Sequence, residues 1–268
     1  GMGVTAVVLA PGWSRFAWAI PDKDNTVFTR QPGGKTQRLA PNPGHVRHLA
    51  LHPTGQSVAA GTRKGSLTLW RANGEQIWQR KGHAPLNDLA FSPDGQQLAA
   101  AFEDGLVVLR QNDGTLTEHR LPVAAKALLF EQAELWVATA EARIQALDRQ
   151  TGAQTRALTV GGPVTAWQRE GDWLVVGHGD GSAGVWHTQT GESVAQLKTQ
   201  GAAEITTVAL RDQTVWLGDG AGAVHVHRLD SGRAVSHKAH SAPITTVAPL
   251  FGGDAFAAGS EDGTASVQ

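Results

Sequence analysis

The 268-residue sequence has no cysteine, no tyrosine, one methionine and no long apolar run. Without cysteine the chain cannot form disulfides, thiolate nucleophiles or cysteine-ligated zinc sites. Lysine and arginine (23) nearly balance aspartate and glutamate (24), so no broad basic surface is available for a nucleic-acid backbone or an anionic membrane. No segment approaches the roughly 18 apolar residues that span a bilayer. We therefore expect a soluble, cytoplasmic protein that binds neither nucleic acid nor membrane.

What the sequence does contain is a repeat of nearly constant length. Short apolar runs such as VRHLAL, LNDLAF and ITTVAL start near residues 4, 46, 86, 125, 164, 205 and 244, so that successive starts lie 39 to 42 residues apart. A period of about 40 to 45 residues that holds several short strands is typical of propeller blades. The repeat therefore predicts a single all-β domain over residues 1–268, a seven-bladed β-propeller with four-stranded antiparallel blades.

The third repeat illustrates the pattern inside one unit. We expect strands at 86–91, 98–102, 106–110 and 115–120, separated by the turn sequences SPDG, EDG and QNDG. These runs are too short for stable helices, and Gly, Asp and Pro stand at the spacing of tight hairpins. A meander of this size cannot cover both of its faces, so it must pack against neighbouring copies.

The last repeat is shorter than the others. The 25 residues from Ile244 to Gln268 provide room for three strands, so we predict a three-stranded last blade. Two explanations stay open. Either the edge at 264–268 pairs with a strand of another chain, or the natural chain continues past Gln268. The oligomeric state and the identity of a partner are left open as well.

The turns and loops resemble those of WD40 repeats. The resemblance is carried by Gly82-His83, by SPDG at 92–95, by an Asp in the turn between the second and third strands and by a Trp that ends the third strand. It covers essentially the whole chain, although no repeat has the complete set. The resemblance implies a structural set in which His, Ser or Thr, Asp and Trp hydrogen-bond and hold the loop to the blade. The matching positions are His83, Asp104, Asp180, Trp70, Trp186, His240 and Asp262.

Residues suited to catalysis or metal binding do not recur at corresponding positions. His225 and His227 share one face of a predicted strand, but His227 falls in the column of the strand-end tryptophans and is interpreted as a packing residue. The glycine-rich stretches at 179–184 and 218–224 lie between strands, so we interpret them as hairpin turns and not as phosphate loops. We expect no catalytic residue, no metal and no cofactor, hence a protein that is not an enzyme. The alternative is a propeller enzyme, or a small-ligand or metal-binding propeller similar to the quinoproteins.

The resemblance also implies where a partner binds, because similar proteins dock partners at the loops between repeats and between the second and third strands. One column there is Thr5, Arg47, Asn87, Lys126, Thr165, Thr206 and Thr245, and a second includes Arg63, Glu103, Gly179, Gly220 and Glu261. Arginine pairs carboxylates through two N–H groups. Our hypothesis is a non-catalytic protein–protein interaction scaffold that docks an acidic peptide or protein segment, and the alternative is an ordinary solvated surface. The predicted partner-binding residues are Arg47, Arg63, Lys64, Asn87, Glu103, Lys126 and Arg143.

Overall fold

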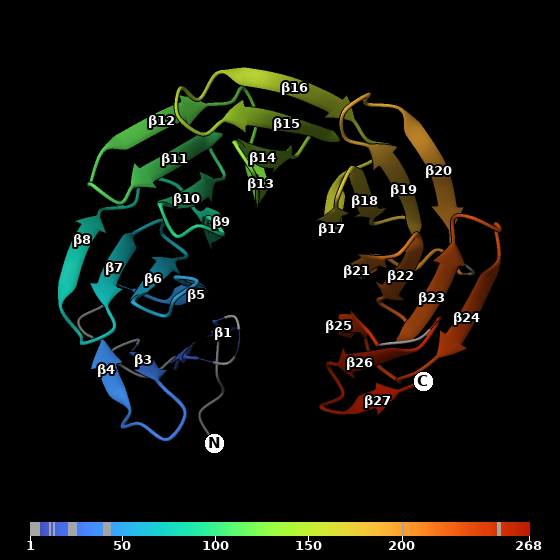
Figure 1. The fold of residues 1–268 in the computed structure, drawn as a ribbon, viewed down its shortest axis with the longest axis horizontal. Coiled ribbons are helices and arrows are strands. Elements are labelled where there is room, and N and C mark those ends of the chain that lie inside the picture. The colour runs from blue at the N-terminus through green and yellow to red at the C-terminus, as the bar shows by residue number, and fades with distance from the viewer. Residues whose placement is uncertain are drawn as a thin grey trace. The chain divides into compact units, whose positions relative to one another are not determined.

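Seven antiparallel sheets make up the protein (Figure 1). The computed structural model describes residues 6–10, 12, 14–20, 26–39, 44–199, 201–250 and 253–268. These residues form 27 strands and no α-helix, and within each sheet every strand pairs with the next one along the chain. No helix in this part of the chain is long and apolar enough to cross a membrane.

The first four sheets hold four strands each. Sheet 1 consists of β1 (Ala6–Leu9), β2 (Phe16–Ala19), β3 (Val27–Arg30) and β4 (Gln37–Leu39). Sheet 2 consists of β5 (Val46–Leu51), β6 (Ser57–Thr62), β7 (Leu67–Arg71) and β8 (Gln76–Arg80). Sheet 3 consists of β9 (Leu86–Phe91), β10 (Gln97–Phe102), β11 (Leu106–Gln111) and β12 (Leu116–Arg120). Sheet 4 consists of β13 (Ala125–Glu131), β14 (Glu134–Thr139), β15 (Arg143–Asp148) and β16 (Gln154–Thr159).

The last three sheets end with a shorter one. Sheet 5 consists of β17 (Val164–Glu170), β18 (Trp173–His178), β19 (Ser182–His187) and β20 (Ser193–Lys198). Sheet 6 consists of β21 (Ile205–Arg211), β22 (Thr214–Asp219), β23 (Ala223–Arg228) and β24 (Ala234–Lys238). Sheet 7 consists of β25 (Ile244–Pro249), β26 (Phe256–Ser260) and β27 (Ala265–Val267). The chain divides into two compact units, residues 1–140 with 144–156 and residues 141–143 with 157–268.

The predicted fold class is confirmed. Six antiparallel meanders of four strands and a last one of three are the blades of a seven-bladed propeller fold. The strands of the third repeat differ from the predicted ones by at most one residue at either end. The first predicted strand start lies outside the described residues, as does Thr5, and β1 is described from Ala6 onward.

Strand alternation explains how one sheet serves two interfaces. In β10, which is buried along its whole length, Leu98, Ala100 and Phe102 pack with residues of sheet 2. The intervening Ala99 and Ala101 pack with residues of sheet 4. Successive side chains of a strand point to opposite faces, so a short apolar run of this kind covers both neighbours. The outer strand β12 alternates exposed and half-buried residues instead, because only one of its faces is covered.

Candidate functional site

Three predicted cations lie together on sheet 2. Arg47 is on β5, and Arg63 and Lys64 are in the turn between β6 and β7; all three side chains are exposed. The Arg63 amide donates to the His45 carbonyl oxygen at 3.0 Å, which holds the turn beside the start of β5. His45, Arg47 and Arg63 line a hollow of about 360 Å³. Within the described residues no ion pair neutralises any of these three cations, so the hollow is open to an anion.

Three other predicted residues bind one another. Lys126 Nζ lies 2.8 and 2.7 Å from the two carboxylate oxygens of Glu103, and Asn87 Nδ2 donates to Glu103 Oε2 at 2.7 Å. Hydrogen bonds from Lys126 and Asn87 lower the pKa of Glu103. Asn87 Nδ2 also donates to the Ala125 carbonyl oxygen at 2.8 Å, so the cluster joins β9 to β13. The charge of Lys126 is therefore already balanced within the chain. Arg143, exposed at the first residue of β15, belongs to the other compact unit.

Asp88 was missed by the sequence reasoning although it is the neighbour of Asn87. One of its carboxylate oxygens accepts the Leu89 amide at 2.7 Å and the other accepts the Leu128 amide at 2.8 Å. Burial raises the pKa of Asp88, and these two backbone donors and the nearby His48 act in the opposite direction. The available signal was an aspartate in the middle of a strand whose other residues, apart from Asn87, are apolar. The buried carboxylate of Asp88 therefore links β9 of sheet 3 to β13 of sheet 4.

The predicted structural pairs lie close together in sheets 3 and 7. His83 Nε2 lies 3.0 Å from Asp104 Oδ2, and Arg120 Nη1 lies 3.1 Å from the same oxygen. Burial acts to raise the pKa of Asp104, but the hydrogen bonds from Arg120 and the Leu106 amide lower it overall.

In sheet 7, a buried histidine lies beside three polar residues, two in the turn that follows β26 and one in β27. His240 hydrogen-bonds Thr264 Oγ1 and Ser266 Oγ, each at 2.9 Å, and lies 3.5 Å from Asp262. The Thr264 hydroxyl donates to Asp262 at 2.5 Å and is the main reason that the pKa of Asp262 is lowered. The histidine therefore holds the loop before β25 to the turn that follows β26.

In sheet 5 the histidine that contacts a loop comes from a different position of the repeat than His83 and His240. The repeat has Gly-Gly-Pro where the leading histidine is expected, and His178, the last residue of β18, is buried against the edge of Trp186 with ring centroids 6.5 Å apart. His178 Nδ1 donates to the Pro163 carbonyl oxygen at 3.2 Å. Asp180 accepts the Ser182 amide and hydroxyl at 2.9 and 2.6 Å, which closes the turn. The signal in the sequence was a histidine two residues before the turn aspartate.

In sheet 6 the buried, hydrogen-bonded histidine comes from a third position of the repeat. His225 of β23 is 2% exposed; its Nε2 lies 3.0 Å from Asp219 Oδ2 and its Nδ1 lies 2.7 Å from Ser236 Oγ. Hydrolases use the same three residue types, but there the serine stands at a substrate cavity with oxyanion donors. Here Ser236 pairs in register with His225 across β23 and β24, so its hydroxyl satisfies the buried imidazole. The arrangement links three strands of one sheet.

Trp70 departs from the set that the resemblance implies. Its side chain is fully buried in sheet 2, and its indole N–H has no hydrogen-bond partner within the described residues. His227, in the same column of sheet 6, is also buried, and its pKa is lowered by burial and by His225. No group of three or more His, Cys, Asp or Glu side chains in the described part of the chain is placed to hold a metal ion.

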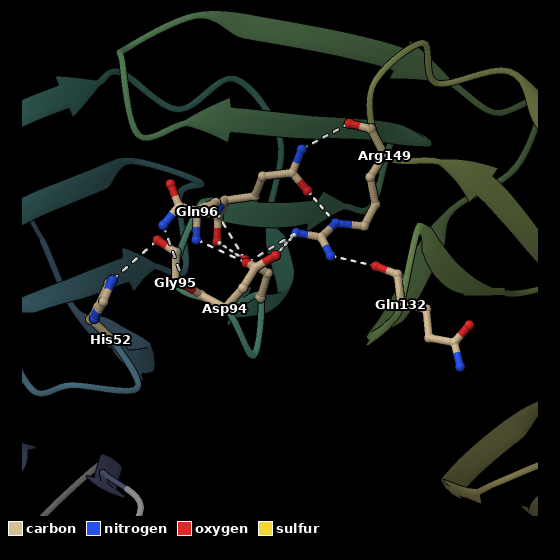
Figure 2. A network of polar contacts seen from close by, with 8 residues as sticks. His52, Asp94, Gly95, Gln96, Gln132 and Arg149 are labelled. Carbon is tan, nitrogen blue, oxygen red and sulfur yellow. Dashed lines mark hydrogen bonds and ion pairs between the residues drawn. The ribbon is translucent and has the colours of Figure 1, made fainter.

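The SPDG turn of sheet 3 is held on one side by an arginine of sheet 4 (Figure 2). Arg149 Nη2 lies 3.1 and 3.0 Å from the two carboxylate oxygens of Asp94. Its Nε donates to Gln97 at 2.5 Å, and its Nη1 donates to the Gln132 carbonyl oxygen at 2.5 Å. Burial acts to raise the pKa of Asp94, but Ser92, the Gln96 amide and Arg149 lower it to about 2. The sequence reasoning treated SPDG only as a turn and missed Arg149.

A histidine of sheet 2 holds the other side of the same turn. His52 Nε2 lies 3.1 Å from the Gly95 carbonyl oxygen, as Figure 2 shows. Gly95 has φ of +71°, and a Cβ added there would lie 2.1 Å from His52 Nε2. Only glycine fits both the backbone conformation and the close approach. The turn is therefore a joint among three consecutive sheets.

Comparisons with known proteins agree with this repeat structure. Residues 49–133 match the family described as anaphase-promoting complex subunit 4 WD40 domain, and residues 233–267 match the family described as WD domain, G-beta repeat. The chain is similar to eukaryotic translation initiation factor 3 subunit I of Candida albicans, with 24% identity over 190 residues that cover 67% of this chain and 47% of the relative. It is also similar to small ribosomal subunit protein RACK1z of Arabidopsis thaliana, with 26% identity over 149 residues that cover 55% of this chain and 41% of the relative. The chain thus spans less than half the length of these curated relatives.

The fold has a counterpart among solved structures. The crystal structure of the computationally designed Ika8 protein matches with a TM-score of 0.83 and 24% identity, over 98% of this chain and 82% of that one. At this identity the likeness concerns the fold.

Proposed function

Because the chain belongs to the WD40-repeat family, we propose that it is a non-catalytic scaffold that binds an acidic segment of a protein partner. Membership of this family supports an interaction role in general. Two similar proteins are named as subunits of larger assemblies, a translation initiation factor and a small ribosomal subunit. These names also support action in the cytoplasm. In this proposal residues 1–268 act as a single domain.

One observation carries the choice of surface. The hollow of sheet 2 is lined by His45, Arg47 and Arg63, and no described residue neutralises the two arginines. Exposed guanidinium groups that lack a partner can pair a carboxylate bidentately without first breaking an internal ion pair. Lys64 adds a third charge beside them.

The rest of the predicted site contributes hydrogen bonds more than charge. In the cluster of Asn87, Glu103 and Lys126 the lysine is balanced by the glutamate, so an approaching carboxylate would have to compete with Glu103. We assign this cluster a flanking role, in which Asn87 and Lys126 contact polar groups of the partner.

Charge reversal tests the proposal directly. We would capture partners from a lysate of the source organism on the immobilised chain, and compare the wild type with the double variant Arg47→Glu and Arg63→Glu. The matched control, Lys198→Glu with Arg233→Glu, makes the same change in net charge at exposed positions of sheets 5 and 6. We expect the first variant to lose the captured partner and the control to retain it. Equal capture by both variants would reject this surface.

A further inference from the structure

Arg110 stands in a position that other sheets fill with tryptophan. In sheet 3 it pairs in register with Leu98, just as Trp70 pairs with Val58 in sheet 2 and Trp186 pairs with Leu174 in sheet 5. These two tryptophans are 0% and 4% exposed. At Arg110 the fold therefore places a cation where its equivalents bury an apolar ring.

Arg110 makes no ion pair within the described residues, and the carboxylate that acts on it electrostatically is that of Asp113. Its Nη1 donates to the Gln111 carbonyl oxygen at 3.0 Å, and its guanidinium carbon lies 5.6 Å from the centre of the Trp78 ring. Its Nε is buried and has no hydrogen-bond partner in the same part of the chain. Burial lowers the pKa of Arg110, and Asp113 opposes this effect only in part. A half-buried charge with an unmet donor is costly unless an anion approaches.

Arg110 also lines a cavity of about 390 Å³ between sheets 2 and 3, which lie side by side in Figure 1. The apolar part of the lining is Leu69, Ile77, Phe91 and Leu98, and the polar part includes His52, Arg71, Gln96 and Asn112. No Asp or Glu is among the lining residues. A volume of this size with an apolar wall and a few polar groups is within the range of ligand pockets.

The charge balance of the cavity favours a monoanion. Arg71, the second guanidinium of the lining, already pairs with Glu75 at 2.5 Å. The remaining guanidinium is that of Arg110, which makes no ion pair within the described residues, and a single positive charge matches one carboxylate better than a doubly charged phosphate. The apolar wall suits the methylene groups that carry such a carboxylate.

We propose that this inter-sheet cavity binds an acidic side chain of an extended peptide segment, with its carboxylate on Arg110. The guanidinium fork gives the carboxylate two donors, and Nε is the one that has no hydrogen-bond partner within the described residues. Neighbouring peptide groups can bond the rim residues Gln96 and Asn112. The cavity lies beside the SPDG turn, at the end of β6 and β10 opposite to the loop that carries Arg63. The site is therefore independent of the surface in the proposed function.

A peptide titration tests this assignment. The probe is a fluorescein-labelled hexapeptide of alternating Leu and Glu, and the reference peptide has Gln in place of Glu. The variant Arg110→Leu should fold, because Leu147 occupies the corresponding position of sheet 4. We expect binding of the Glu peptide to weaken at least about tenfold in this variant, as for a lost charged hydrogen bond. Arg233→Leu, an exposed control, should bind as the wild type does.

Several outcomes would overturn the assignment. Equal binding of the Gln peptide, or unchanged affinity in Arg110→Leu, would remove the carboxylate contact. Competition by glutarate as strong as by the unlabelled Glu peptide would assign the cavity to a free organic acid instead of a peptide. The Arg47→Glu and Arg63→Glu variant should bind the probe normally, and a loss there would place the peptide on the other surface.

Nuclear magnetic resonance provides a second readout that does not depend on the label. The Nε–H resonance of Arg110 can be assigned by its absence in Arg110→Leu. We expect this resonance to shift on addition of the Glu peptide and to stay in place on addition of the Gln peptide. If the chemical shift of this resonance stays the same with both peptides, the proposal is contradicted.

Discussion

Sheet 3 packs against sheet 4 on one side and against sheet 2 on the other, and each of these two seams contains an arginine. Arg149 lies between sheets 3 and 4, Arg110 lies between sheets 2 and 3, and their surroundings differ. Arg149 is 11% exposed and has a bidentate carboxylate, a glutamine side chain and a backbone carbonyl as partners. Arg110 has one carbonyl and the face of an indole. One residue type can therefore be either a structural joint or a ligand contact. The number of partners that the chain itself provides decides between the two.

The largest loss of stability is expected in the SPDG turn, which joins sheets 2, 3 and 4. Gly95→Ala should destabilise the fold by about 3 kcal/mol, because an L-residue is strained at φ of +71° and the new methyl group would overlap the His52 ring. Urea unfolding measures this loss. In the His52→Ala background the steric part should disappear and only the backbone strain of about 1 kcal/mol should remain. An equal loss in both backgrounds would mean that His52 does not clamp the turn.

Removing the satisfied arginine should cost less but still clearly destabilise. Arg149→Leu leaves Asp94 and Gln97 without their donor, and we expect a loss of about 2 kcal/mol in urea unfolding. Arg233→Leu, which removes an exposed arginine of sheet 6, should change the free energy of unfolding by less than about 0.5 kcal/mol. If both variants unfold at the same urea concentration, Arg149 is not a joint.

Acid should weaken the same contact. The pKa of Asp94 is about 2, below its ordinary value of about 3.9. A lowered pKa contributes stability that is present above pH 4 and is lost as the pH falls through 2. Because half of the Asp94 side chain is exposed, screening reduces this contribution to about 1 kcal/mol. The difference in stability between the wild type and Asp94→Asn should therefore shrink from pH 5 to pH 2, and a constant difference would contradict the assignment.

The smallest effect, with the opposite sign, is expected at Arg110. Arg110→Leu removes a half-buried charge that makes no ion pair within the described residues and adds apolar contact at a position that sheet 4 fills with Leu147, so we expect a gain of about 0.5 kcal/mol. The midpoint of urea unfolding should rise slightly. A loss as large as that of Arg149→Leu would show that Arg110 is a structural joint as well, and would remove the contrast between the two seams.

The histidine contacts show where sequence patterns stop being informative. The pairs of His83 with Asp104 and of His240 with Asp262 follow from the spacing of a known motif. His178 and His225 also hold parts of their sheets together by hydrogen bonds, but they come from the end of a second strand and from the middle of a third strand. A motif that assigns the histidine to one sequence position cannot detect such replacements, because their partners are brought close only when the sheet folds.

The candidate partner surface gives the same lesson for charge. The predicted set contained four cations and two other polar residues on sheets 2 to 4 besides Arg143, and it treated them as one surface. In the structure Lys126 and Asn87 both donate to Glu103, whereas Arg47 and Arg63 line a hollow and have no acidic partner among the described residues. Net charge along the sequence does not show which charges are already paired, since pairing depends on side chains from different strands.

The strands, their turns and the number of sheets could be predicted from the sequence because they depend on local properties. A strand alternates with period two, and a tight turn needs glycine or aspartate within a few residues. The partners of each arginine depend instead on distant residues. Arg149 and Asp94 are 55 positions apart, and Arg110 stacks on a tryptophan of the preceding sheet. The repeat provides the same position in every sheet, but the adjacent sheet provides the groups that the side chain at this position contacts. Only the packing of one sheet on the next therefore decides whether the charge of such an arginine is satisfied.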